Sequence, residues 1–133
     1  MKRLTTEWVR KAESDMVAVS ALWDAKPGLH DVVCFHCQQA AEKYLKAMMQ
    51  ESGLPVPRIH NLDQLLLLLL PIDASLRSLR RGLKTLSRYA AEYRYPGASA
   101  TAAQARSALK LTRRVREAIR QRLGLDKRSE PAP

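Results

Sequence analysis

The chain has 133 residues, of which 46% are hydrophobic, with a formal net charge of +10 and a pI near 10.1. This length is enough for one domain with a core that needs no disulfide or metal, and the positive charge favours an anionic partner such as nucleic acid, a nucleotide or an acidic protein. Few glycines and prolines, with apolar residues at helical spacing throughout, predict an all-α fold.

Membrane insertion and metal binding are both disfavoured. The apolar run from Leu65 is closed by Pro71, far short of the ~20 residues that a membrane span requires. The N-terminus is polar and lacks the apolar segment of a signal peptide, so we expect a cytoplasmic protein. Cys34 and Cys37 lie one turn apart on an apolar face without a second ligand pair. They predict buried, reduced thiols, and no metal or other cofactor is expected.

The first predicted helix begins near Thr5 or Thr6, either of which can cap it, and ends at residues 26–28. Its predicted buried stripe consists of Trp8, Ala12, Met16, Val19, Leu22 and Trp23. Asp15 falls within the same arc, where an unpaired carboxylate would be costly. We therefore expect Asp15 to pair with a cation from elsewhere in the bundle, with Arg94 as the first candidate and Lys43 as the second.

The second predicted helix covers residues 29–52, with Gly53 as its stop. One arc is apolar and predicts burial against two neighbouring helices. The opposite arc is polar, and Glu42 precedes Lys46 by four residues in the favourable order for an ion pair. Pattern alone favours a solvated, salt-bridged surface for this arc, which consists of His36, Gln39, Glu42, Lys43, Lys46 and Gln50.

A short leucine-rich helix should follow, capped by Asn61, and a third long helix should restart at Asp73 or Ser75 after Pro71. Its leucines recur at spacings of three and four, which is typical of a bundle seam. Its other side carries four cations, for which two interpretations remain open: a solvated face, or a ridge that follows RNA phosphates. These four are Arg77, Arg81, Lys84 and Arg88.

The last predicted helix begins at a cap of Ser99 or Thr101 and stops at Gly124, and its outer face is expected to carry Arg106, Lys110, Arg113 and Arg120. Residues 125–133 are polar and proline-containing, and predict a disordered tail. The fold class expected is therefore an antiparallel, up-and-down four-helix bundle with one additional short helix, in a single domain over residues 1–124.

Three motifs together resemble the HEPN domain family. They are Gln-Gln-Ala-Ala-Glu-Lys-Tyr-Leu-Lys-Ala at residues 38–47, His-Asn-Leu at 60–62 and Arg-Tyr-Pro at 94–96. The resemblance implies a small helical bundle, commonly a homodimer, that is associated with nucleotides or RNA. Such domains are often encoded beside a minimal nucleotidyltransferase. One branch of the family contains metal-independent ribonucleases with an Arg-x4-6-His motif.

No catalytic set is evident in this sequence. None of the three histidines follows an arginine at the spacing of the ribonuclease motif, and Arg94-Tyr95-Pro96 stands in its place without a histidine after it. A P-loop, a Cys-His pair on one face and clustered carboxylates are also missing. What remains is a candidate anion or nucleotide site, if the elements meet at one end of the bundle: Gln39, Lys43, Lys46, His60, Arg94 and Tyr95. A histidine just outside a helix start, as His60 is, is more often a loop or capping residue than a catalyst.

The preferred interpretation is a non-catalytic nucleotide- or RNA-binding module that acts with a nucleotidyltransferase partner, in a toxin–antitoxin-like or substrate-binding role. One alternative is a metal-independent ribonuclease toxin with a rearranged site. Another is a purely structural assembly domain whose basic faces meet an acidic partner.

Overall fold

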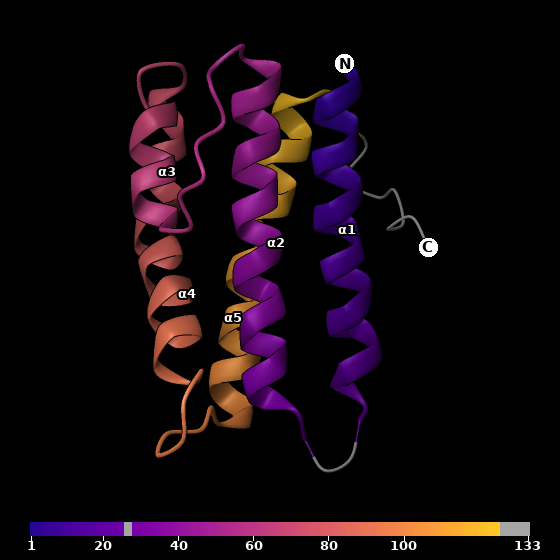
Figure 1. Ribbon diagram of the computed structural model, residues 1–133, viewed down its shortest axis with the longest axis vertical. Helices are drawn as coiled ribbons and strands as arrows, with labels where there is room; N and C mark the ends of the chain where they lie inside the picture. The colour runs from indigo at the N-terminus through magenta and orange to yellow at the C-terminus, as the bar shows by residue number, and fades with distance from the viewer. Residues whose placement is uncertain (26–27, 126–133) are drawn as a thin grey trace.

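The computed structural model describes residues 1–25 and 28–125, and every regular element within them is helical. The elements are α1 (Arg3–Trp23), α2 (His30–Glu51), α3 (Leu62–Leu69), a 3₁₀ helix η1 (Ala74–Leu79), α4 (Arg80–Glu92) and α5 (Ala102–Arg122). The predicted all-α class is confirmed. The long helices lie side by side, and the chain runs down α1, up α2, down α4 and up α5 (Figure 1).

The helix α2 occupies the centre of the bundle, because it packs against α1, α3, α4 and α5. Its apolar arc supplies fully buried side chains such as Tyr44 and Leu45 to the common core. Both cysteines are buried there, as predicted, and burial raises the pKa of the Cys34 thiol to about 11 and that of Cys37 to about 12. Neither thiol is therefore ionised to a useful extent at neutral pH.

Local signals placed several helix ends correctly. The Asn61 side chain accepts a hydrogen bond from the Gln64 amide and caps α3. Thr101 and Gln104 form a reciprocal capping box at the start of α5. Gly53 and Gly124 follow α2 and α5 with positive φ angles of 78° and 73°, a conformation that glycine adopts at little cost.

Three expectations about the helices were wrong. First, α1 begins at Arg3, before both predicted caps, and the Thr5 hydroxyl donates instead to Glu51 at 2.9 Å. Second, the third long helix is divided, since residues 74–79 form the tighter 3₁₀ helix η1 before α4 starts. Third, Trp23 is 40% exposed, because it lies at the last turn of α1.

None of the helices that the structure describes is long and apolar enough to cross a bilayer. The tail that was predicted to be disordered, residues 125–133, lies outside the described residues except for Leu125.

Candidate functional site

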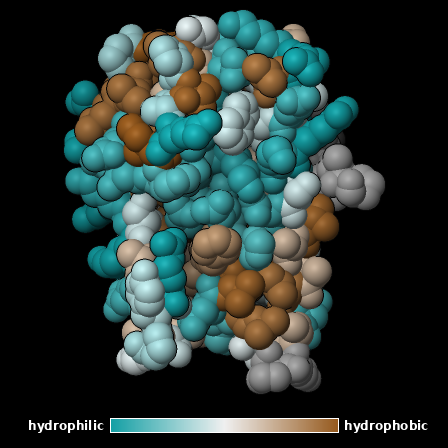
Figure 2. Space-filling model, in the orientation of Figure 1, coloured by the Kyte–Doolittle hydropathy of each residue, from teal (hydrophilic) through white to brown (hydrophobic). Residues whose placement is uncertain are grey.

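The polar arc of α2 is not the solvated surface that its sequence pattern favours. Glu42 and Lys46 are each only 4% exposed, and His36, Gln39 and Lys43 are half-buried. Two neighbours cover the arc: α1 contacts one edge, and the segment that leads into α3 contacts the other. Figure 2 shows hydrophilic side chains as a band across the middle of this face, between apolar groups over α3 and over the lower ends of α1 and α2.

The first polar cluster joins α1 to α2 around Asp15, which is 8% exposed. Its carboxylate binds the Lys43 ammonium at 2.6 Å and the His36 Nδ1 at 2.9 Å. Because an ionised carboxylate only accepts hydrogen bonds, the His36 Nδ1 carries the proton and donates it. The prediction that Asp15 is buried and paired is thus confirmed, and Lys43, the second candidate, is its cation.

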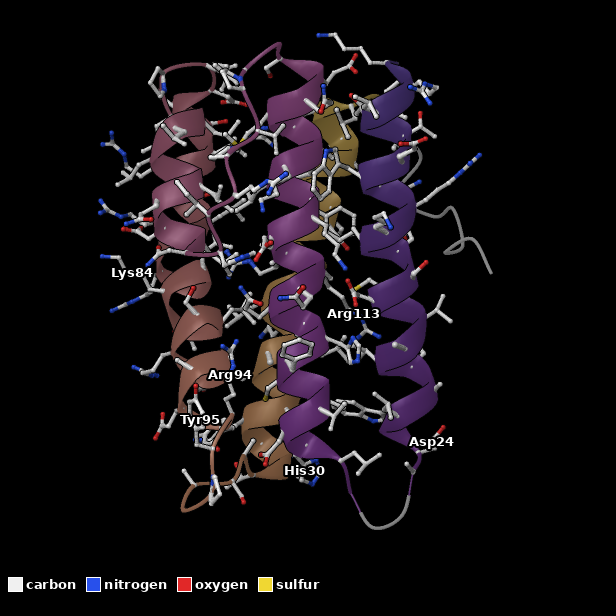
Figure 3. The ribbon with its side chains drawn as sticks, viewed as in Figure 1. Asp24, His30, Lys84, Arg94, Tyr95 and Arg113 are labelled. Atoms are coloured by element: carbon white, nitrogen blue, oxygen red, sulfur yellow. The ribbon has the colours of Figure 1, made fainter. Side chains whose placement is uncertain are left out.

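Arg94, the first candidate partner of Asp15, was the wrong choice. It lies beyond the last turn of α4 and is exposed, as is Tyr95, which is 67% exposed (Figure 3). Neither side chain forms an ion pair or hydrogen bond with another residue of the described part of the chain. Within the described residues, no hydrogen bond or ion pair therefore joins Arg94 or Tyr95 to the cations of α2.

The second polar cluster gathers around Glu42. Its carboxylate accepts from the Lys46 ammonium at 3.1 Å and from the His60 Nδ1 at 3.1 Å. The Gln38 amide donates to the His60 carbonyl at 3.2 Å, and the Gln39 amide donates to the Gln38 side chain at 2.9 Å. The expected meeting of Lys46 and His60 therefore occurs, but through a carboxylate that stands between them.

This arrangement limits what the predicted anion site can do. Lys43 and Lys46 each have a carboxylate within hydrogen-bond distance, so much of their positive charge is already compensated, and the His60 Nδ1 is occupied by Glu42. A phosphate that displaced Asp15 or Glu42 would leave a buried carboxylate without its cation, which is costly. We conclude that these residues position α1, α2 and the following segment, and that free cations for a ligand must come from elsewhere.

The four cations of the predicted ridge, Arg77, Arg81, Lys84 and Arg88, are all exposed. Arg77 comes from η1, and the others follow one side of α4 at spacings of three and four residues, which places them in line. Lys84 points away from the bundle (Figure 3). Within the described residues no acidic side chain lies at ion-pair distance from any of the four, whereas the neighbouring Arg80 is held by Asp63 at 2.8 Å.

A third polar cluster was not predicted at all. Glu13 is 3% exposed, and its carboxylate accepts from Arg116 at 3.1 Å and from Arg120 at 2.8 Å. Arg120 was expected on the outer face of α5 but is only 4% exposed, because α1 supplies a carboxylate that lets it turn inward. The buried Tyr44 lies nearby, and burial together with the Glu13 charge raises the pKa of its hydroxyl.

The sequence did contain a signal for this cluster. Glu13 is spaced four residues from Val9 and three from Met16, both buried, so it shares their side of α1. Arg116 and Arg120 are four residues apart and therefore lie on one face of α5. Nothing local shows that these two faces meet, since the partners are 103 and 107 residues apart.

The described residues contain no group of three or more histidine, cysteine, aspartate or glutamate side chains that could hold a metal ion. The polar clusters instead pair carboxylates with lysine, arginine and histidine, which is the chemistry of ion-pair networks. No curated protein and no solved structure matches this chain. The family model described as HEPN domain matches residues 5–122, nearly the whole bundle, and includes all three motifs at residues 38–47, 60–62 and 94–96. The chain therefore belongs to the HEPN domain family.

Proposed function

We propose that this chain is a non-catalytic RNA- or nucleotide-binding module that works as a homodimer in the cytoplasm with a nucleotidyltransferase partner. Membership in the HEPN family supports a function related to nucleotides or RNA. The observation that carries the proposal is the ridge of Arg77, Arg81, Lys84 and Arg88, whose side chains are exposed and form no ion pair within the described residues. A row of surface cations on a chain with a net charge of +10 attracts a phosphate backbone, whatever the base sequence of the RNA.

RNA binding through the ridge should show a steep salt dependence. Reversing two of its charges, with Arg81→Glu and Arg88→Glu together, should flatten the plot of log affinity against log salt by about 1.4, because each lost phosphate contact on a single strand contributes about 0.7. Fluorescence anisotropy of a labelled single-stranded RNA over a range of salt concentrations measures the slope. A matched control reverses Arg10 and Lys110, which are exposed on α1 and α5. Equal slopes for the two double variants would show that only net charge matters.

A ribonuclease is the second candidate function, and one observation favours it. The Asp15 carboxylate orients His36 through Nδ1, which leaves Nε2 to take or give a proton, as a general base requires. However, no arginine lies at the family spacing before a histidine, and Lys43 beside His36 is held by the same carboxylate. We therefore expect no cleavage.

Purified protein should leave a labelled RNA intact, with or without divalent metal ions, over an incubation in which a trace of a known ribonuclease degrades it fully. A gel or mass-spectrometric assay of the products tests this. Cleavage that follows the protein through purification and disappears in His36→Ala or His60→Ala would establish the ribonuclease instead. If the unmodified protein neither binds nor cleaves RNA, the result would favour an assembly domain.

A further inference from the structure

A cleft is lined by the first turns of α1, the last turns of α2 and the segment that follows α2. These ends of α1 and α2 lie at the top of the bundle in Figure 1. Its volume is about 380 Å³, within the range of about 300–1,000 Å³ that small-molecule sites occupy. The lining residues are Leu4, Glu7, Trp8, Lys11, Lys46, Gln50, Val56, Pro57 and Arg58. Of the site residues that were predicted from the sequence, only Lys46 lines this cleft.

One side of the cleft is apolar and aromatic. Trp8 is half-buried there, and the Lys46 ammonium lies 5.7 Å from the centre of its ring, within the distance of a cation–π contact. Lys46 is fixed by Glu42 as well, so it holds the Trp8 ring in place rather than offering a full charge to a ligand. Val56 and Pro57 add apolar lining from the segment after α2. The result is a pre-formed surface on which a flat, apolar group can lie.

The rim of the cleft is cationic. Lys11 and Arg58 are both exposed, and neither has an acidic partner within the described residues. The single carboxylate of the lining, Glu7, is within 3.6 Å of Arg3, which offsets part of its charge. The Gln50 side chain adds an amide that can donate and accept hydrogen bonds. A ligand that fits this cleft therefore combines an anionic group with a flat ring that has a hydrogen-bonding edge.

We propose that this cleft binds a nucleoside phosphate, with the base against Trp8 and Pro57 and the phosphates between Lys11 and Arg58. The proposal rests on the proposed function, since it names a ligand class and a site for it. It places that site on α1, α2 and the segment after α2, away from Arg94-Tyr95-Pro96 and from the ridge on α4. A single nucleotide is favoured over a longer strand because the lining contains one aromatic side chain, Trp8, and two cations without an acidic partner, Lys11 and Arg58.

The chain offers a direct optical test, because it contains only two tryptophans, Trp8 and Trp23. The Trp23→Phe variant leaves Trp8 as the one reporter, and Trp23 lies at the other end of α1. We expect ATP, ADP or AMP to quench Trp8 fluorescence saturably when it is excited at the red edge, where nucleotides do not absorb. Inorganic triphosphate should bind the rim more weakly and quench little, since it has no ring to stack.

Charge reversals identify the site. In the Trp23→Phe background, Lys11→Glu and Arg58→Glu should each weaken ATP binding by about tenfold or more, the usual loss for a hydrogen bond to a charged group. Arg81→Glu is the matched control, because it changes the net charge by the same amount but lies on the ridge, outside the cleft. It should leave the ATP affinity within about twofold of the unmodified value. The same Arg81→Glu variant should bind single-stranded RNA more weakly, while Arg58→Glu should affect RNA less.

Three results would overturn the proposal: no saturable quenching with millimolar ATP, equal affinity for inorganic triphosphate, or an equal loss of ATP affinity in Arg81→Glu and Arg58→Glu. Persistent RNA binding alongside any of these would reject the cleft alone. Absence of both RNA and nucleotide binding in a protein that melts cooperatively would reject the proposed function too.

Discussion

Replacing Glu13 with alanine is expected to lower the free energy of unfolding by about 3–5 kcal/mol, the usual loss when one member of a buried ion-pair network is removed. The Glu13 carboxylate is 3% exposed and is shared by two guanidinium groups, from Arg116 and Arg120. The side chains of these arginines are only 12% and 5% exposed, so little water can replace the lost carboxylate. Since the free energy of unfolding of a small domain is only about 5–15 kcal/mol, this one substitution should bring the bundle close to unfolding.

Urea unfolding followed by circular dichroism at the helical band measures the effect. The matched control is Glu7→Ala, which removes a carboxylate from the same helix whose side chain is 49% exposed and whose contact with Arg3 spans 3.6 Å. It should change stability by less than about 0.5 kcal/mol. A similar small change for Glu13→Ala would contradict the buried network.

A second variant separates charge from packing. Glu13→Leu together with Arg116→Met and Arg120→Met replaces the network by apolar side chains of similar size, and such replacements are often neutral or stabilising. We expect the triple variant to be at least as stable as Glu13→Ala and to approach the unmodified protein. A triple variant less stable than Glu13→Ala would mean that the arginines contribute mainly through their other contacts.

The features that the sequence predicted well are those that depend on a few adjacent residues. Asn61 caps α3 and Thr101 caps α5 because a side-chain oxygen needs only an amide two or three residues later. The burial of Asp15 followed in the same way from its place in an apolar stripe. The split between η1 and α4 was missed, because both helix types place residues 76, 79 and 83 on one side and the pattern does not distinguish them.

The candidate site was predicted less well, because its properties depend on what covers each face. The polar arc of α2 looks solvated from its own sequence, yet the segment around His60 folds back on Glu42 and buries it. Lys46, which the pattern predicts as a surface cation, is therefore bound to Glu42 and lies over the Trp8 ring. Arg58 and Lys11, which no local pattern singles out, line one cleft only because α1 lies beside the end of α2.

Stability measurements on variants of the Asp15 cluster can identify the cation that pairs with this carboxylate. Asp15→Ala should cost roughly 2–3 kcal/mol, less than Glu13→Ala, because the Lys43 and His36 side chains are 24% and 27% exposed and can regain some water. In a double-mutant cycle with Lys43→Met, the two losses should overlap by about 1–2 kcal/mol, as expected for residues in direct contact. The measurement is again the free energy of unfolding in urea.

The control for this cycle is Arg94→Met, since Arg94 has the same charge but is exposed beyond α4 and makes no ion pair with the described residues. Alone it should change stability by less than about 0.5 kcal/mol, and together with Asp15→Ala the effects should simply add. Because Lys43 approaches Asp15 at 2.6 Å, only the Lys43 cycle can show strong coupling. Coupling between Asp15 and Arg94 with none to Lys43 would show that the carboxylate is held from α4 in solution, and Lys43 would then be available to a phosphate.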